Sequence, residues 1–238
     1  MKRSRGQRRV LIALAAGAVL ASGCGVVTKV TNAIHSVEAN LQTVDAFTKN
    51  LQAGPTGPFA ATYATTGGAP AGVVYAVNPA ANELAFQETQ SGSGATNTQL
   101  IFNASGDYLC TQNGAGAAWS CDKLSSSDAA SHQQVFDVYT PAHWSDFLKG
   151  LSVAAGLEGG KVTRSTMVVN GFDLDCLDLD LKDVTGTTTI CTTPQGLLGY
   201  VKAPQDSTSF EITAFTTSPS PSLFQLPPGA TVTTVTAP

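Results

Sequence analysis

The run PFAATYATTGGAPAGVVYAVNPAANELAFQETQ, residues 58–90, decides the fold. It contains three short segments rich in Val, Thr, Tyr and Phe, at 58–66, 72–78 and 83–90. Gly67-Gly68 and Asn78-Pro79 separate these segments, and such residues are typical of turns between strands. Because consecutive strands with short connections usually pair with each other, the run predicts an antiparallel meander.

The same pattern of short strand-like segments separated by turn residues continues downstream in two blocks. Further strands are predicted at 98–103, 106–112 and 117–123, and then at 161–169, 171–181, 187–193, 198–203, 208–216 and 222–226. Residues 231–238 are expected to fray as a chain end.

Two helical regions interrupt or precede the strands. The first is predicted at 28–53, where one apolar stripe recurs at steps of three, four or seven residues before Gly54-Pro55 ends it. Its members are Val30, Ile34, Val37, Leu41, Val44 and Leu51. The second region lies between the strand blocks: a weak helix through Tyr139, then a new start at Thr140-Pro141 and an expected stop at Gly156.

Together these elements predict an α+β fold. We expect a curved antiparallel sheet of about 11 strands, a half-open barrel, whose concave face is covered by the N-terminal helix and a mid-chain helical lid.

One strand has an unusual pattern. In 172–181 the apolar residues change parity after Cys176, which predicts a one-residue β-bulge there so that a single face stays buried. Five acids, Asp173, Asp175, Asp178, Asp180 and Asp183, alternate with the apolar residues. Their spacing is that of a strand and lacks the glycine-centred loop of calcium motifs, so a solvated outer sheet face is the favoured interpretation over a calcium site.

The N-terminus carries an export signal. Five basic residues among the first nine precede the apolar run Val10–Leu20 and the small residues Ala21-Ser22-Gly23 before Cys24. These residues resemble a bacterial lipobox, which implies lipidation of Cys24 after removal of residues 1–23. An ordinary signal peptide with an incidental cysteine is the alternative, and Arg8-Arg9 leaves export by the twin-arginine route open beside the general route.

Charge restricts the partners of the mature chain. Removing five of the 13 basic residues leaves 13 − 5 = 8 against 17 acidic ones, a net charge of −9 over 215 residues. An acidic chain without a basic stripe argues against nucleic acid and against electrostatic docking on anionic lipid. We therefore expect a covalent lipid anchor that holds residues 24–238, as a single domain, at the extracytoplasmic face of a bacterial membrane.

Four cysteines remain after Cys24. In an oxidising compartment an even number predicts two disulfides, for which three connectivities can form. We predict Cys110–Cys121 and Cys176–Cys191, because each pair brackets a turn-rich segment and would staple a local hairpin, worth roughly 3 kcal/mol per bridge. A zinc site is the rival interpretation, but no C-x-x-C occurs and the histidines are not clustered with the cysteines.

No catalytic pattern emerges from the sequence. It contains no nucleophile elbow, no H-E-x-x-H, no P-loop and no dinucleotide-binding fingerprint. The histidines are His35, His132 and His143. Two of them lie on or beside predicted helix faces, where a solvated side chain is the ordinary explanation. We therefore expect no enzyme activity, no cofactor and no metal.

A binding cavity is predicted instead. If the helices do not fill the concave side of the sheet, the remaining apolar space would take a small hydrophobic molecule, whereas a dry, filled core is the alternative. The candidate lining residues are Phe59, Tyr63, Leu84, Phe86, Phe102, Trp144, Phe147, Leu148 and Leu151.

The order of elements resembles the LolA/LolB-like superfamily, including mycobacterial lipid-carrier lipoproteins of the LppX and LprG type. The closing segments Phe215-Thr216-Thr217 and Phe224-Gln225-Leu226-Pro227-Pro228-Gly229-Ala230 are similar to the family's terminal strand and F-x-L-P-x-G-A exit. The resemblance implies a half-open barrel with a cavity for acyl chains and a role in lipid or lipoprotein handling. Anchoring and paired cysteines depart from the mobile carriers and favour a stationary acceptor, donor or sensor, so an envelope-signalling module that contacts another envelope protein is the alternative function.

Overall fold

The computed structural model describes residues 24–51, 54–67, 71–91, 94–139, 144–181, 185–204 and 207–234, with the side chains of 24–34, 50–51 and 133–139 left out of the description. The predicted signal peptide, the side chain of Cys24 and the predicted helix start at Thr140-Pro141 therefore lie outside the described residues.

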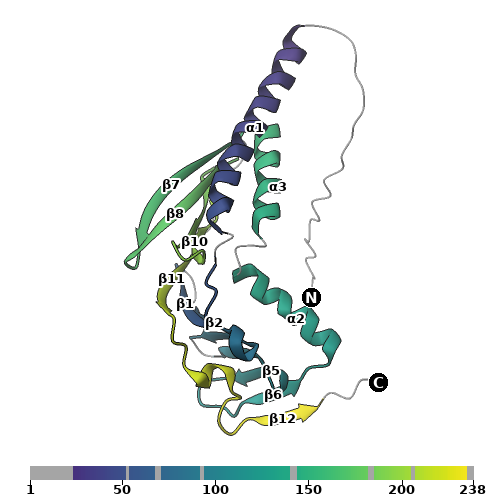
Figure 1. The fold of residues 1–238 in the computed structure, drawn as a ribbon, viewed down its shortest axis with the longest axis vertical. Helices are drawn as coiled ribbons and strands as arrows, with labels where there is room; N and C mark the ends of the chain where they lie inside the picture. Colours follow the sequence, from purple (N-terminus) through teal and green to yellow (C-terminus); the bar gives the residue numbers. More distant parts are fainter. Residues whose placement is uncertain are drawn as a thin grey trace, which may run out of the picture.

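The strands form one curved, unclosed sheet with helices on its concave side (Figure 1). The order across the sheet is β12-β6-β5-β4-β3-β2-β1-β11-β10-β9-β8-β7. The first meander comprises β1 (Phe59–Thr66), β2 (Ala71–Asn78), β3 (Glu83–Gln90), β4 (Thr96–Asn103), β5 (Gly106–Asn113) and β6 (Ser120–Lys123). The second comprises β7 (Lys161–Val169), β8 (Phe172–Asp180), β9 (Thr187–Thr192), β10 (Leu198–Lys202) and β11 (Ser209–Thr216). This confirms the predicted α+β class and half-open barrel, with twelve described strands in place of about eleven.

The two meanders join where β1 pairs with β11. The register of this pair shifts at Tyr63, which lies opposite Ile212 although Thr62 lies opposite Ala214. Thr213 is thus an extra residue, and the hydroxyl of Thr213 donates to the carbonyl of Thr62 at 3.2 Å. A bulge of this kind increases the local twist, which helps the sheet to curl at the junction of its halves.

The C-terminal segment covers part of the convex face. A 3-10 helix, η3 (Pro221–Phe224), stands where a strand at 222–226 was predicted, so that prediction was wrong. Phe224 is buried over Ala60, Ala76 and Ala85, three small residues that lie side by side on β1, β2 and β3. The predicted frayed end was also wrong for 231–234, because β12 (Thr231–Thr234) pairs in parallel with β6.

Three α-helices, α1 (Cys24–Leu51), α2 (Ser126–Tyr139) and α3 (Trp144–Leu157), accompany the sheet, together with the short 3-10 helix η1 (Pro79–Ala81). Helices α1 and α3 lie side by side over the second meander, whereas α2 lies on the concave side of the first (Figure 1). Among the described residues, no helix combines the length and the hydropathy needed to cross a membrane.

Helix α3 continues through Gly156, so the predicted stop there was wrong. A side chain at Gly156 would put its Cβ 2.7 Å from the Cα of Val37, which shows that this glycine is a point of close approach between α1 and α3. The helix ends at Leu157, and Gly159, whose φ is +76°, is the left-handed residue of a Schellman motif in which the amide of Gly160 donates to the carbonyl of Ala155 at 2.6 Å.

Strand β8 buries both of its faces. The predicted bulge near Cys176 is absent, because the pairings of β8 with β7 and β9 run through this residue without a shift. Leu177 and Leu179 instead pack under α1 and α3, whereas Leu174 and Cys176 pack on the convex face beside Tyr200. The apolar parity changes because the buried side of the strand changes along its length.

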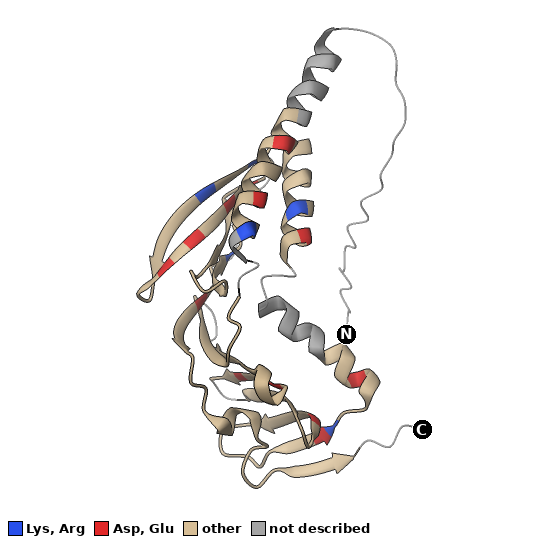
Figure 2. Cartoon of the chain, in the orientation of Figure 1, with Lys and Arg blue, Asp and Glu red and all other residues tan. Residues whose placement is uncertain are grey.

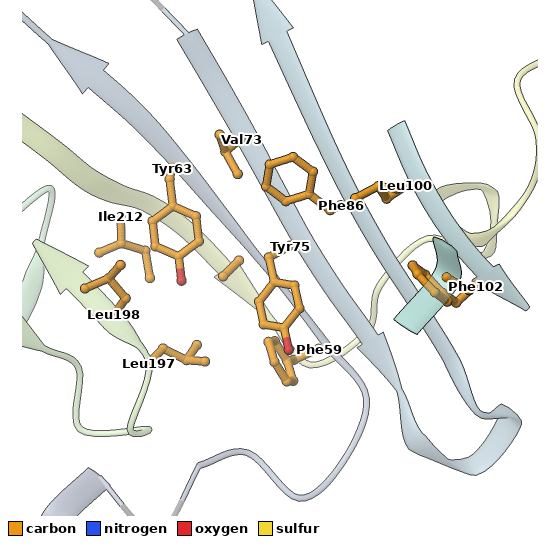
Figure 3. Close-up of a cluster of buried hydrophobic side chains, with 12 residues drawn as sticks. Phe59, Tyr63, Val73, Tyr75, Phe86, Leu100, Phe102, Leu197, Leu198 and Ile212 are labelled. Atoms are coloured by element: carbon orange, nitrogen blue, oxygen red, sulfur yellow. The ribbon is translucent and has the colours of Figure 1, made fainter. Parts of the chain in front are cut away.

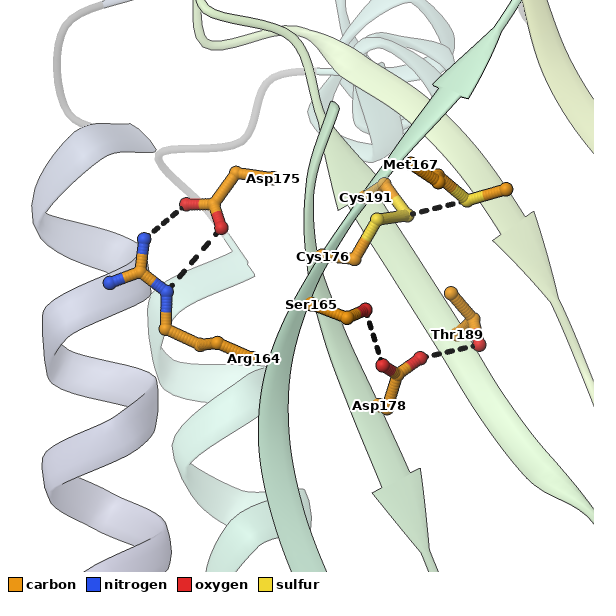
Figure 4. Close-up of a disulfide and its surroundings, with 8 residues drawn as sticks. All are labelled: Arg164, Ser165, Met167, Asp175, Cys176, Asp178, Thr189 and Cys191. Atoms are coloured by element: carbon orange, nitrogen blue, oxygen red, sulfur yellow. Dashed lines mark hydrogen bonds and ion pairs between the residues drawn. A yellow bond between two sulfur atoms is a disulfide. The ribbon is translucent and has the colours of Figure 1, made fainter. Parts of the chain in front are cut away.

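The same alternation divides the acids of β8 between two faces. Asp178 and Asp180 lie on the convex face, where Asp178 accepts hydrogen bonds from Ser165 and Thr189 at 2.5 and 2.7 Å (Figure 4). Asp173 and Asp175 lie on the helix side, and Asp175 forms an ion pair with Arg164 at 2.5 Å (Figure 4). The prediction that all five acids share one outer face is therefore correct only for Asp178 and Asp180. Asp183 lies outside the described residues.

Both disulfides have the predicted pairing. Cys110 faces Cys121 directly across β5 and β6, and Cys176 faces Cys191 across β8 and β9 (Figure 4), each with a Cα–Cα distance of 4.0 Å. Both bridges lie on the convex face, one in each meander. They fix strand pairs on the side of the sheet away from the α-helices.

One buried side chain joins α1 to the α3–β7 connection. Asn40, 3% exposed, donates its amide hydrogens to the carbonyls of Ser152 and Gly160, both at 3.3 Å. Its carbonyl oxygen accepts from the backbone amide of Val162 at 2.9 Å. All three partners are main-chain groups, and each lies more than 100 positions away in the sequence, so Asn40 acts as a clamp between distant segments.

Removing the Asn40 amide should destabilise the protein strongly. In Asn40→Ala, one buried amide and two carbonyls lose a partner, so we expect the free energy of unfolding to fall by about 2–4 kcal/mol. The control is Gln42→Ala, two positions along the same helix and exposed, which should change it by less than about 0.5 kcal/mol. Equal effects of the two substitutions in urea unfolding would show that the clamp is unimportant.

Two glycines of α3 should respond in opposite ways to alanine. At Gly156 the new methyl meets the backbone of Val37, so Gly156→Ala should cost about 1–3 kcal/mol. At Gly150 no atom lies within 4 Å of the added Cβ, so Gly150→Ala should stabilise the helix by up to about 1 kcal/mol. Thermal unfolding of both variants tests this, and a stabilised Gly156→Ala would contradict the close helix contact.

Candidate functional site

The concave face of the first meander is an apolar wall. Alternation along β1, β2 and β4 directs every second side chain to this face, and β3 and β11 add one buried residue each. The buried members from these five strands are Phe59, Ala61, Tyr63, Val73, Tyr75, Phe86, Leu100, Phe102 and Ile212. Leu197, Leu198 and Ala129 complete the cluster, which we call the concave wall (Figure 3).

Aromatic rings hold the centre of the wall together. Phe59 meets Tyr75 edge to face, with ring centroids 5.5 Å apart and planes at 78°. Tyr63 stacks on Phe210 of β11 at 4.9 Å and 14°. Each such pair contributes roughly 0.5–1.5 kcal/mol beyond the burial of its rings. The stacking of Tyr63 on Phe210 therefore helps to hold β1 and β11 together.

The predicted cavity residues fall into two groups. Phe59, Tyr63, Phe86 and Phe102 lie in the concave wall, and Leu84 packs against it. Leu148 is buried between α1, α3 and the second meander, with Leu151 packed against the same cluster. Trp144 contacts both clusters and therefore lies at their junction.

Phe147 is separate from both groups. It is 60% exposed, one of the few large apolar side chains on the described surface. The predicted spacing correctly identified an apolar face on α3, but Phe147 lies at the rim of that face.

Part of the wall was not predicted from the sequence. Tyr75 is 5% exposed and Ile212 is fully buried, yet neither was singled out. Tyr75 could have been found from its parity with Val73 in β2. Ile212 could not, because the bulge at Thr213 breaks the alternation in β11.

A separate hollow lies where α1 ends above the second meander. It has a volume of about 930 Å³ and is lined by parts of β7, β8, α1 and the segment after β9. The lining residues are Lys49, Thr166, Met167, Val168, Asp173, Leu174, Asp175, Thr192, Thr193 and Pro194. Acidic and basic positions are frequent along α1, α3 and the β7–β8 pair (Figure 2), so this hollow is more polar than the concave wall.

The buried members of the wall include no carboxylate, imidazole or amine. Its buried members are apolar or aromatic, and its described surroundings contain no group of three or more His, Cys, Asp or Glu that could hold a metal. His35 lies on α1 and is exposed, His132 is half-buried on α2, and His143 lies outside the described residues. The arrangement suits burial of an apolar surface.

No protein-family model matches the chain. The curated proteins contain no match either. Among solved structures, an uncharacterized conserved protein from Thermus thermophilus aligns with 82% of this chain and 98% of its own, at 8% identity and a TM-score of 0.43. MucB, in complex with MucA(peri), aligns with 81% of this chain and 62% of its own, at 11% identity and a TM-score of 0.44. Similarities this low carry no information about function.

Proposed function

We propose that this protein is a non-catalytic binding protein of a bacterial cell envelope, which holds a hydrophobic ligand such as an acyl chain between the concave wall and its helices. One observation supports this most strongly: the wall is apolar from β11 across to β4. Of the α2 side chains that the structure describes, small Ala129 is the one that packs against it. Each methylene of a ligand buried there would contribute about 0.8 kcal/mol.

We further propose that the protein is exported and anchored through a lipid on Cys24, at the extracytoplasmic face of the membrane. Helix α1 begins at Cys24, and it closely approaches Gly156 of α3 at Val37. The intervening residues rise about 1.5 Å each, or roughly 20 Å in all. The anchor would thus be a helical stalk, which extends beyond the end of α3 (Figure 1).

A second function is favoured by the burial of the wall. Its members are at most 8% exposed, which is also the condition of a filled core. In that case the domain would be a sensor or interaction module that contacts another envelope protein, with no ligand inside.

A substitution on α2 separates the two functions. If there is room for a ligand, Ala129→Trp should fill it, leave the melting temperature nearly unchanged and weaken binding of a fluorescent fatty-acid probe by about tenfold or more. Ala130→Trp, one position along and exposed, should leave binding unchanged.

A filled core gives another result. Ala129→Trp would then overpack the wall and lower the free energy of unfolding by about 1–3 kcal/mol, while the unaltered protein would not bind the probe. That pair of results would contradict ligand binding and favour the interaction module.

A further inference from the structure

The second meander ends in a long edge strand. β7 has nine residues and pairs with β8 on one side, and in the described part of the chain no strand pairs with its other side. Unpaired backbone groups on a strand of this length are a template for another strand.

The hairpin geometry identifies which groups face outward. Asn170 and Gly171, at φ +50° and +84°, form a two-residue turn between the facing residues Val169 and Phe172. In an antiparallel pair the residues alternate between facing the partner and facing away, and the amide of Val162 points to Asn40 instead of β8. The outward residues after Val162 are therefore Arg164, Thr166 and Val168.

Within the described part of the chain, the outward backbone groups of these three residues have no hydrogen-bond partner. The outward amide of Val162 donates to the side chain of Asn40. No described residue donates to or accepts from the outward amides and carbonyls of Arg164, Thr166 and Val168. β7 also lacks the usual protection of an edge. Its pairing is regular, and from Ser165 to Val169 it carries no charge.

Space for a backbone lies along this edge. At its start, a hollow of about 670 Å³ separates β7 residues 161–164 from small side chains of α1, including Ala39, Thr43 and Ala46. Farther along, the 930 Å³ hollow adjoins Thr166 and Val168, and Val168 is 67% exposed. The two hollows have no lining residue in common, and the larger one also extends over β8 and the end of β9, but both border β7 and α1. We call the space along this side of β7 the groove.

We propose that an extended peptide segment of a partner protein docks in this groove as an additional strand on residues 164–168 of β7. An extended backbone matches a row of alternating amides and carbonyls in both spacing and direction. Because α1 walls one side of the groove at 39–46, a single segment fits better than the edge of a second copy of this chain.

The groove also indicates the sequence of its occupant. Met167, Leu174 and Pro194 give the larger hollow an apolar part, which suits an apolar side chain. Lys49 lines the same hollow, but Asp173 and Asp175 do so too, and of these Asp175 is paired with Arg164, so the lining sets no charge preference for the occupant. The groove lies apart from the concave wall, so this proposal is independent of ligand binding.

The test uses a fluorescein-labelled nine-residue peptide of alternating valine and threonine. Its binding to the exported protein is followed by fluorescence anisotropy. Thr166→Pro removes one outward amide and should weaken binding about tenfold, whereas Thr166→Ala keeps the amide and should leave binding unchanged. A peptide N-methylated at alternate backbone nitrogens on its pairing edge should not bind, which tests the proposal even if Thr166→Pro does not fold.

Three outcomes would overturn the proposal. One is no binding of the unmodified peptide up to about 1 mM. Another is equal binding of both peptides or equal affinity of both variants, which would place the contact elsewhere. The third is a concentration-dependent dimer in analytical ultracentrifugation that Thr166→Pro abolishes, because a second copy would then occupy the edge.

Discussion

The structure depends on a single buried amide. Asn40 satisfies three main-chain groups at the point where α3 ends and β7 begins, and it does so from the middle of α1. A buried polar group of this kind is costly unless every bond is made, so it permits one register between the helix and the sheet. The close contact of Gly156 with Val37 sets the distance between the helices at nearly the same level. Together these contacts fix the two helices over the second meander and leave the β7 edge open from Arg164 onward.

The two halves of the sheet use their faces differently. In the first meander, the concave side is a wall of aromatic and aliphatic residues, and the convex side is closed by the C-terminal segment over a row of alanines. In the second meander, the concave side is closed by α1 and α3, and β8 is buried on both faces. The disulfides lie on the convex side of both halves. One half of the sheet is thus closed by helices, whereas the other presents an apolar wall, and our proposal places the ligand at that wall.

Much of this fold follows from local patterns, but its decisive contacts do not. Strand and helix positions were predictable because alternation and helical periodicity reflect burial on one face. Strand β8 is an exception, because side chains on both of its faces are buried. The bulge that was predicted from its change of apolar parity is absent. On α1, the predicted stripe included Leu41, whereas the structure buries Asn40 and Phe47. A polar residue that binds distant main chain has no periodic signature, and the same is true of β12, whose exposed residues pair with β6 only after the chain has crossed the convex face.

The central claim is that the concave wall holds a hydrophobic molecule in the cell. Native mass spectrometry of the Cys24→Ala protein, purified from an exporting host without detergent, tests it most directly, because this variant cannot carry a covalent lipid on Cys24. We predict a complex whose excess mass is that of a lipid and is released on denaturation. A protein that carries no such mass, and that also fails to take up a fatty-acid probe, would contradict the claim and leave a filled interaction module.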